Sequence, residues 1–145
     1  MWLYKDKVIE SLEDFPQDTF GFIYEVTHLP SGKKYLGKKV LFFNQKKTLT
    51  KKELSEWKGP GRKPKYKKVE KESDWKTYYG SQENIKKLVK EGKAEDFKRE
   101  ILHLASNKKM LTYIETKLLF LNEVLEKDEY LNSNILGSFY RKDFE

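Results

Sequence analysis

Residues 20–28 read Phe-Gly-Phe-Ile-Tyr-Glu-Val-Thr-His, and this stretch decides how the first half of the chain folds. Aromatic and β-branched residues favour strands, and Phe22, Tyr24 and Val26 alternate with the residues between them as in a half-covered strand. Leu-Pro-Ser-Gly at 29–32 has the composition of a turn, and residues 33–41 form the returning strand. The sequence therefore predicts a β-hairpin over residues 20–41.

The length of the hairpin loop decides which side chains share a face, because side chains alternate between the two faces of a strand. With an even number of loop residues, Tyr24 faces the same way as Tyr35, Gly37 and Lys39. An odd number would put the two tyrosines on opposite faces. The sequence alone leaves this parity open.

Four more elements follow from periodicity and capping residues. The sequence predicts a helix over 82–91 between a Ser81 cap and Gly92, and a second helix from an Asn107 cap to about Lys127, with leucines at three- and four-residue steps. A third strand is expected at 96–104, and a short helix at 50–57 after Thr50. We expect one α/β (α+β) domain over 1–145, with a small, mainly antiparallel three-stranded sheet flanked by helices.

Composition limits the classes of protein to consider. The chain has no cysteine, so it has neither a disulfide nor a thiolate metal site. No apolar stretch approaches the roughly 20 residues that a membrane span needs, and the N-terminus lacks the apolar run of a signal peptide. We expect a cytoplasmic protein without membrane partners, associated with the nucleoid or acting in a phage-infected cell.

Positive charge is concentrated in one third of the chain. Residues 33–77 hold 16 Lys/Arg and 5 Asp/Glu, whereas the other 100 residues hold 14 and 18. Aromatic residues lie among these lysines, which favours a nucleic-acid partner. We interpret 42–77 as a basic insertion, extended or mobile when alone, that contacts nucleic acid. The residues expected to make such contacts are Lys38, Arg62, Lys63, Lys65, Lys67, Lys68 and Tyr79.

The hairpin carries two short motifs, Phe22-Ile23-Tyr24 and Tyr35-Leu36-Gly37, with ten residues between the tyrosines. They resemble the signature of the GIY-YIG endonuclease family, and the strings GFIYEVTHLPSGKKYLGKK and WKTYYGSQENIKK are similar to its small phage-type members. The resemblance extends to Glu115 and Asn132. It implies a DNA endonuclease that leaves 5′-phosphate and 3′-hydroxyl ends, using one Mg²⁺ or Mn²⁺ ion and no small-molecule organic cofactor.

The resemblance also implies roles for single residues. Tyr35 would accept a proton with Tyr24 in its water network, Glu115 would hold the metal, and Asn132 would orient the site. Glu115 has no Lys or Arg at the spacing of a helical ion pair, which independently favours a metal. Each residue also has a purely structural alternative. The two tyrosines would be ordinary strand aromatics, Glu115 a solvated glutamate at the edge of a helix face, and Asn132 an asparagine in a turn.

One departure from the family concerns the phosphate contact. The family has an arginine in the helix after the second tyrosine motif, and this chain has only lysines there. We expect Lys39, Lys87 and Arg99 to share that role, with Tyr79 and Lys87 returning to the hairpin after the insertion. Two other functions stay open: a catalytically degenerate nucleic-acid-binding protein on the same fold, and a basic RNA-binding protein. Oligomeric state is not predicted.

Overall fold

The computed structural model describes all of residues 1–145 and divides the chain into two compact units. Unit 1 consists of Met1–Leu41 and Asp74–Glu145, and unit 2 of Phe42–Ser73. Residues 74–77, which the expected insertion includes, belong to unit 1. Trp75 explains this, because its ring is fully buried and its carbonyl accepts a hydrogen bond from Trp2 Nε1 at 2.7 Å.

Unit 1 is built on a mixed, mainly antiparallel sheet, as predicted, but the sheet has five strands rather than three. The strands are β1 Trp2–Tyr4, β2 Lys7–Ile9, β3 Gly21–His28, β4 Lys33–Val40 and β7 Phe97–Ala105, in the order β2-β1-β7-β3-β4. Only the β1–β7 pair is parallel. The two additional strands have three residues each, too few for a visible alternation. They are joined by Lys5 and Asp6, both at positive φ, as in a tight hairpin.

The register of the β3–β4 hairpin confirms the even loop. His28 pairs with Lys33 across a four-residue loop, and Tyr24 pairs with Gly37. Paired residues point to the same face of a sheet, so Tyr24 and Tyr35 lie on one face. The third predicted strand is also present, as β7, shifted by one residue from the expected bounds.

Two helices accompany the sheet, α2 Glu83–Lys90 and α3 Lys108–Leu121. Asn107 caps α3 as predicted, but α2 is capped by Gln82 rather than Ser81. α3 ends six residues before the predicted Lys127, because Glu123 takes a left-handed conformation at φ 51°. The leucine pattern continues past this end because the following turn still buries Leu125. None of the helices combines the length and apolar composition needed to cross a membrane.

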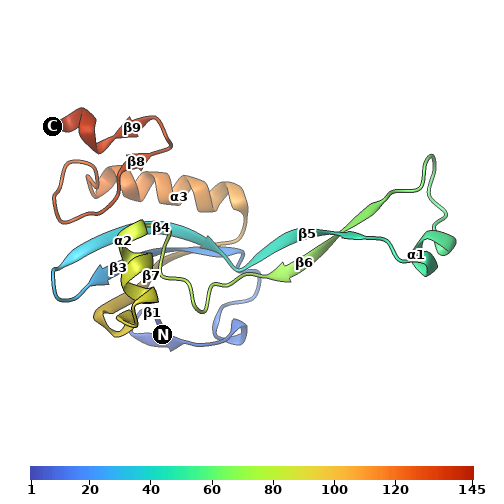
Figure 1. The fold of residues 1–145 in the computed structure, drawn as a ribbon, viewed down its shortest axis with the longest axis horizontal. Helices are drawn as coiled ribbons and strands as arrows, with labels where there is room; N and C mark the ends of the chain where they lie inside the picture. The colour runs from blue at the N-terminus through green and yellow to red at the C-terminus, as the bar shows by residue number, and fades with distance from the viewer. The chain divides into compact units, whose positions relative to one another are not determined.

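The sheet is covered on both faces. α3 lies across one face (Figure 1) and packs Leu111 and Leu119 against Ile23 and Leu36. The other face carries an aromatic cluster in which Trp2 and Phe22 have ring centroids 4.9 Å apart. That cluster also contains Phe15, Tyr24 and Trp75. Unit 1 also contains a small hairpin, β8 Asn134–Ile135 and β9 Phe139–Tyr140, and the short 3-10 helices Leu12–Asp14, Ala94–Asp96 and Arg141–Phe144.

Unit 2 is a two-stranded antiparallel ribbon, β5 Phe42–Thr48 and β6 Tyr66–Glu72, with the helix α1 Lys51–Glu56 in the connection (Figure 1). The short helix predicted after Thr50 is confirmed, since the Thr50 side chain accepts a hydrogen bond from the Glu53 N–H. The two strands were not predicted, because they consist mostly of lysine and other polar residues and show no alternation of apolar with polar residues.

Candidate active site at the edge of β4

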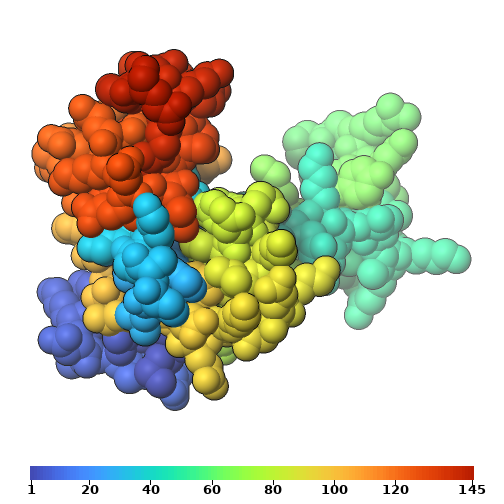
Figure 2. All heavy atoms as spheres, turned by 60° about the vertical axis from the view of Figure 1, so that its left-hand side comes forward, coloured from blue at the N-terminus to red at the C-terminus, as the bar shows by residue number.

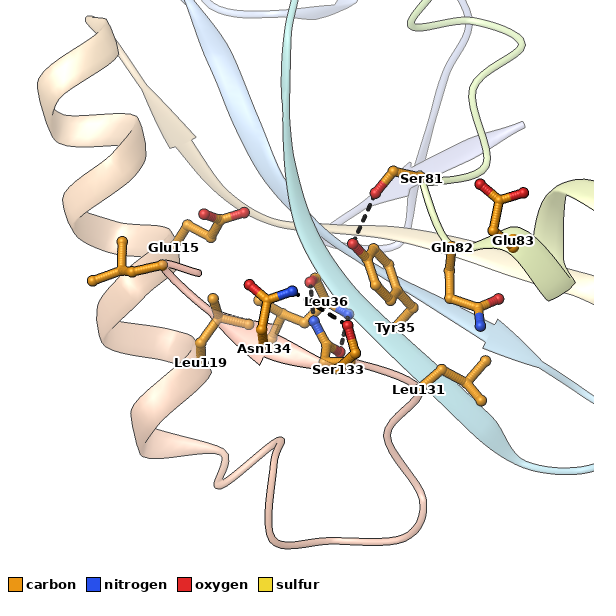
Figure 3. A pocket seen from close by; sticks show the side chains of 12 residues that line it. Tyr35, Leu36, Ser81, Gln82, Glu83, Glu115, Leu119, Leu131, Ser133 and Asn134 are labelled. Atoms are coloured by element: carbon orange, nitrogen blue, oxygen red, sulfur yellow. Dashed lines mark hydrogen bonds between the residues drawn. The ribbon is translucent and has the colours of Figure 1, made fainter. Parts of the chain in front are cut away.

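A cleft of about 400 Å³ lies at the free edge of β4 (Figure 3), within the size range of ligand sites. It is lined by Tyr35 from β4, Glu115 from α3 and Asn132 from the C-terminal segment, with Ser81 before α2. In Figure 2 the end of the hairpin, in light blue, lies between the C-terminal segment and the yellow segment around α2. Residues from four separate parts of the chain therefore meet around one strand.

The two tyrosines lie side by side on one face of the sheet, with ring centroids 6.4 Å apart. Tyr24 is only 1% exposed, and its hydroxyl lies 3.4 Å from that of Tyr78. Gly37 makes this packing possible, because a Cβ there would lie 2.6 Å from Tyr24 Oη. The Tyr35 hydroxyl lies in the cleft, 2.9 Å from Ser81 Oγ (Figure 3).

Burial controls the acidity of both phenols. It raises the pKa of Tyr24 well above the usual value, and the neighbouring Tyr78 adds to this shift. Burial also raises the pKa of Tyr35, although the hydrogen bond with Ser81 acts in the opposite direction. Lys38 and Lys39, which follow Tyr35 in the sequence, do not offset the effect of burial on either pKa. Both phenols are therefore neutral at pH 7 unless another cation enters the cleft.

Glu115 lines the cleft from the opposite side of β4. Its nearest cation is Lys38 Nζ, 3.9 Å from the carboxylate, and Lys38 also donates to Thr112 Oγ1 at 2.9 Å. Burial raises the pKa of Glu115, and Lys38 partly offsets this. The protein has no group of three or more His, Asp or Glu side chains arranged so that they could hold a metal ion by themselves. Glu115 offers one carboxylate, the kind of ligand that a Mg²⁺-type ion takes together with water and phosphate oxygens.

Asn132 is hydrogen-bonded to the outer edge of β4, where the sheet has no further strand. Its Oδ1 accepts a hydrogen bond from the Leu36 N–H at 3.1 Å, and its Nδ2 donates to the Leu36 carbonyl at 2.8 Å. The side chain is 4% exposed. The neighbouring Lys34 exchanges main-chain hydrogen bonds with Glu129 and Leu131. Asn132 thus supplies the pairing that a further strand would give, directly beside Tyr35.

The lysines next to Tyr35 point to opposite faces of β4. Lys38 lies on the Glu115 side, whereas Lys39 lies on the tyrosine side, 2.5 Å from Asp74 and 4.0 Å from the centre of the Tyr78 ring. That bond to Lys39 lowers the pKa of Asp74. Lys87 is exposed on α2 and does not line the cleft.

The segment after the insertion returns to the hairpin, as the sequence suggested, but through Tyr78 and Ser81 rather than Tyr79 and Lys87. The Tyr79 ring faces away and stacks 4.1 Å from the guanidinium of Arg99. The string WKTYYGSQENIKK contained Tyr78 and Ser81, although it did not indicate which tyrosine turns inward.

Arg99 lies inside the protein rather than in the cleft. It is 4% exposed, and its Nη1 donates to the carbonyls of Lys76 and Tyr78 at 3.0 and 2.8 Å. Its Nε is buried without a hydrogen-bond partner. Arg99 therefore holds the returning segment against the sheet, and the phosphate contact suggested for it from sequence is wrong.

The other predicted nucleic-acid contacts lie in unit 2. Lys67 is paired with Glu53 of α1. The remaining ones are exposed and make no ion pair; they are Arg62, Lys63, Lys65 and Lys68.

Comparison with known proteins gives a family match over most of the chain. The family model described as 'Putative endonuclease segE, GIY-YIG domain' matches residues 2–135, a range that includes both tyrosines, Glu115 and Asn132. The comparisons with curated proteins and with solved structures gave no match. Because the family match covers nearly the whole chain, the protein belongs to the segE-type GIY-YIG endonuclease family.

Proposed function

We propose that this protein is a metal-dependent DNA endonuclease that hydrolyses phosphodiester bonds to 5′-phosphate and 3′-hydroxyl ends. The observation that carries the proposal is the meeting of Tyr35, Glu115 and Asn132 in one cleft. The family match supports the nuclease class and DNA as the substrate. The remaining steps assign tasks to the residues around the cleft.

Glu115 would hold one Mg²⁺ or Mn²⁺ ion. Such an ion neutralises charge on the scissile phosphate and makes water more acidic. Glu115 suits this role because it is half-buried and its only cationic partner is 3.9 Å away. A buried carboxylate without a close cation is unfavourable, so a bound divalent ion stabilises it.

Tyr35 would take the proton of the attacking water. Of the two tyrosines, Tyr35 is the one that lines the cleft, and Ser81 can donate a hydrogen bond to its hydroxyl. Such a donor stabilises a phenolate, which opposes the rise in pKa that burial causes. Tyr24 is too buried to contact substrate, so its role is to position Tyr35 and Tyr78.

Lys38 and Lys39 would contact the phosphates on either side of β4. Each lysine presents an ammonium group, which supplies the positive charge of the family's arginine but not its two parallel N–H donors. Lys39 is held by Asp74, so a phosphate must displace that carboxylate or share the lysine with it.

Unit 2 would bind DNA beyond the scissile bond. It holds eleven of the 30 Lys/Arg and four of the 23 Asp/Glu, a surplus of seven that equals the net charge of the chain. Unit 1 therefore has 19 of each sign and no net charge. Affinity that depends on unit 2 should fall steeply with salt, because phosphate contacts release counterions.

A second candidate is a protein on this fold that binds nucleic acid without cutting it. Two observations favour it: the raised pKa of Tyr35, and a cleft lining without Lys or Arg. Both weaken the proton transfer and the charge neutralisation that cleavage needs.

Nicking of supercoiled plasmid separates the two candidates. With Mg²⁺ or Mn²⁺ the wild type should nick, whereas Tyr35→Phe and Glu115→Gln should lose at least about a hundredfold of the rate. Tyr113→Phe, on an exposed tyrosine of α3, is the matched control and should keep full activity. Nicking that survives both cleft substitutions refutes the assigned mechanism. Binding of plasmid by the wild type without nicking, with either metal, favours the second candidate.

A further inference from the structure

The positive charge of unit 2 is concentrated in the middle of its sequence, away from the two points where the chain joins unit 1. Ten of the eleven Lys/Arg of unit 2, but only two of its four Glu, lie between residues 46 and 68. Glu70 and Glu72 lie at the other end of β6, together with Lys71. The residues that adjoin unit 1 in sequence are therefore close to neutral, and the middle of unit 2 is strongly basic.

Within this basic part, the register sets lysines directly opposite each other. Lys46 pairs with Lys68, and the next pair is Lys47 with Lys67. Directly opposed side chains in an antiparallel pair are about 4.5–5.5 Å apart at Cβ, and like charges at that distance destabilise the pair. A two-stranded ribbon is only marginally stable by itself. Two like-charged pairs in succession are therefore unfavourable unless an anion lies against them.

The two lysine pairs lie on opposite faces of the ribbon and differ in their surroundings. On one face Lys67 is half-buried and is neutralised by Glu53 of α1. On the other face Lys46 and Lys68 are exposed and have no acidic partner within ion-pair distance. Glu70 lies on the same face, opposite Asn44, without pairing to either lysine.

The next pair on this open face is Thr48 with Tyr66, whose ring is 56% exposed. The open face thus presents two ammonium groups, a hydroxyl and a phenol in neighbouring positions. These groups suit a phosphate backbone, which accepts hydrogen bonds and ion pairs from such side chains. A two-stranded ribbon also has the width that the major groove of B-DNA admits.

We propose that the face formed by Lys46, Thr48, Tyr66 and Lys68 is the surface of unit 2 that contacts the phosphates of duplex DNA. This rests on the proposed function in one respect, namely that duplex DNA is the substrate. Contact with phosphates removes the repulsion between Lys46 and Lys68, so the ribbon becomes more stable when DNA binds.

The choice of substitution separates binding from ribbon stability. Lys46→Glu places an acid opposite Lys68, which stabilises the strand pair but removes the phosphate contacts of this face. Lys47→Glu is the matched control, because it is the adjacent residue with the same change of charge on the other face. Binding of the full-length protein to a fluorescent duplex is measured in EDTA, so that no cleavage occurs, between about 0.05 and 0.2 M salt.

Each phosphate contact steepens the fall of log affinity with log salt concentration by about 0.9. One contact therefore makes binding roughly eightfold tighter at 0.1 M salt than at 1 M salt. Lys46→Glu removes two contacts, so we expect a slope smaller by about 2 and a loss of roughly 60-fold at 0.1 M. Lys47→Glu should lose less than about tenfold in affinity, because salt at this concentration screens the effect of a charge on phosphates more than roughly 10 Å away. Amide hydrogen exchange in 42–73 should slow in Lys46→Glu without DNA, because the introduced glutamate then pairs with Lys68.

Equal losses in the two variants overturn the proposal, because the charge of unit 2 would then act without a preferred face. Tighter binding to single-stranded RNA or DNA than to duplex, abolished by Tyr66→Ala, overturns it in favour of base stacking. Failure of the proposed function is distinguishable: the wild type would then not nick plasmid, while the comparison of the two variants in EDTA would still stand.

Discussion

Replacing Asn132 by alanine tests whether this side chain completes the edge of β4. The change removes two hydrogen bonds, 3.1 and 2.8 Å long, to the main chain of Leu36. A buried polar group left without a partner costs about 1–3 kcal/mol, so the two groups together would cost about 2–6 kcal/mol. Water from the cleft can reach the vacated space, which favours the lower part of that range. We expect about 2–3 kcal/mol, a large part of the stability of a domain this size.

Urea unfolding measures this loss as a shift of the midpoint at unchanged slope. Asn134→Ala is the control, because Asn134 is exposed and caps only a turn, and it should lose less than about 1 kcal/mol. Plasmid nicking by Asn132→Ala, measured where the variant is still folded, should also fall because Leu36 adjoins Tyr35. A variant within about 0.5 kcal/mol of the wild type would refute the reasoning, since it would show that water satisfies Leu36 equally well.

Three more substitutions test the packing and charge of the site. Gly37→Ala should lose about 1–3 kcal/mol in urea unfolding, because its Cβ would lie 2.6 Å from the buried Tyr24 hydroxyl; unchanged stability would contradict that packing. Glu115→Gln should be more stable than the wild type above about pH 4.5. Folding raises the pKa of Glu115, so the protonated carboxyl favours the folded state at low pH, and this contribution to stability is lost as the pH rises through the pKa of the folded state. The gap should narrow with Mg²⁺, and a wild type that gains stability over this range would contradict the shift. Arg99→Lys should lose about 2 kcal/mol of stability and speed hydrogen exchange at 76–80, because an ammonium does not reproduce the planar guanidinium that lies between the Trp2 and Tyr79 rings while it donates to two carbonyls; an unchanged urea midpoint would argue against the role of Arg99.

The elements predicted correctly are those in which local chemistry and tertiary packing agree. The β3–β4 hairpin has strand formers on both sides of a Pro-Ser-Gly turn, and α3 starts at an asparagine that caps it. The β1–β2 hairpin was missed because its strands are short and its turn residues, Lys5 and Asp6, do not usually mark one. The end of α3 was misplaced because the leucines beyond it remain buried after the helix stops.

The site was only partly predictable for a different reason. Tyr24, Tyr35, Glu115 and Asn132 were found through the family's motif, which records positions along the chain. The direction of a side chain depends on packing, so the motif could not say that Tyr78 turns toward Tyr24. It also could not say that an arginine in β7 would be buried beneath the returning segment rather than exposed to substrate.

The ion pair between Lys39 and Asp74 bears on how the insertion and the site are combined in one chain. Lys39 and Asp74 flank the two junctions of unit 2 with unit 1, and their ion pair joins the chain before the insertion to the chain after it. The same lysine lies over the ring of Tyr78, which contacts Tyr24. Unit 1 is therefore closed by its own contacts on both sides of the insertion. This explains how 32 residues can be inserted between β4 and the returning segment while Tyr35, Ser81 and Glu115 still line one cleft.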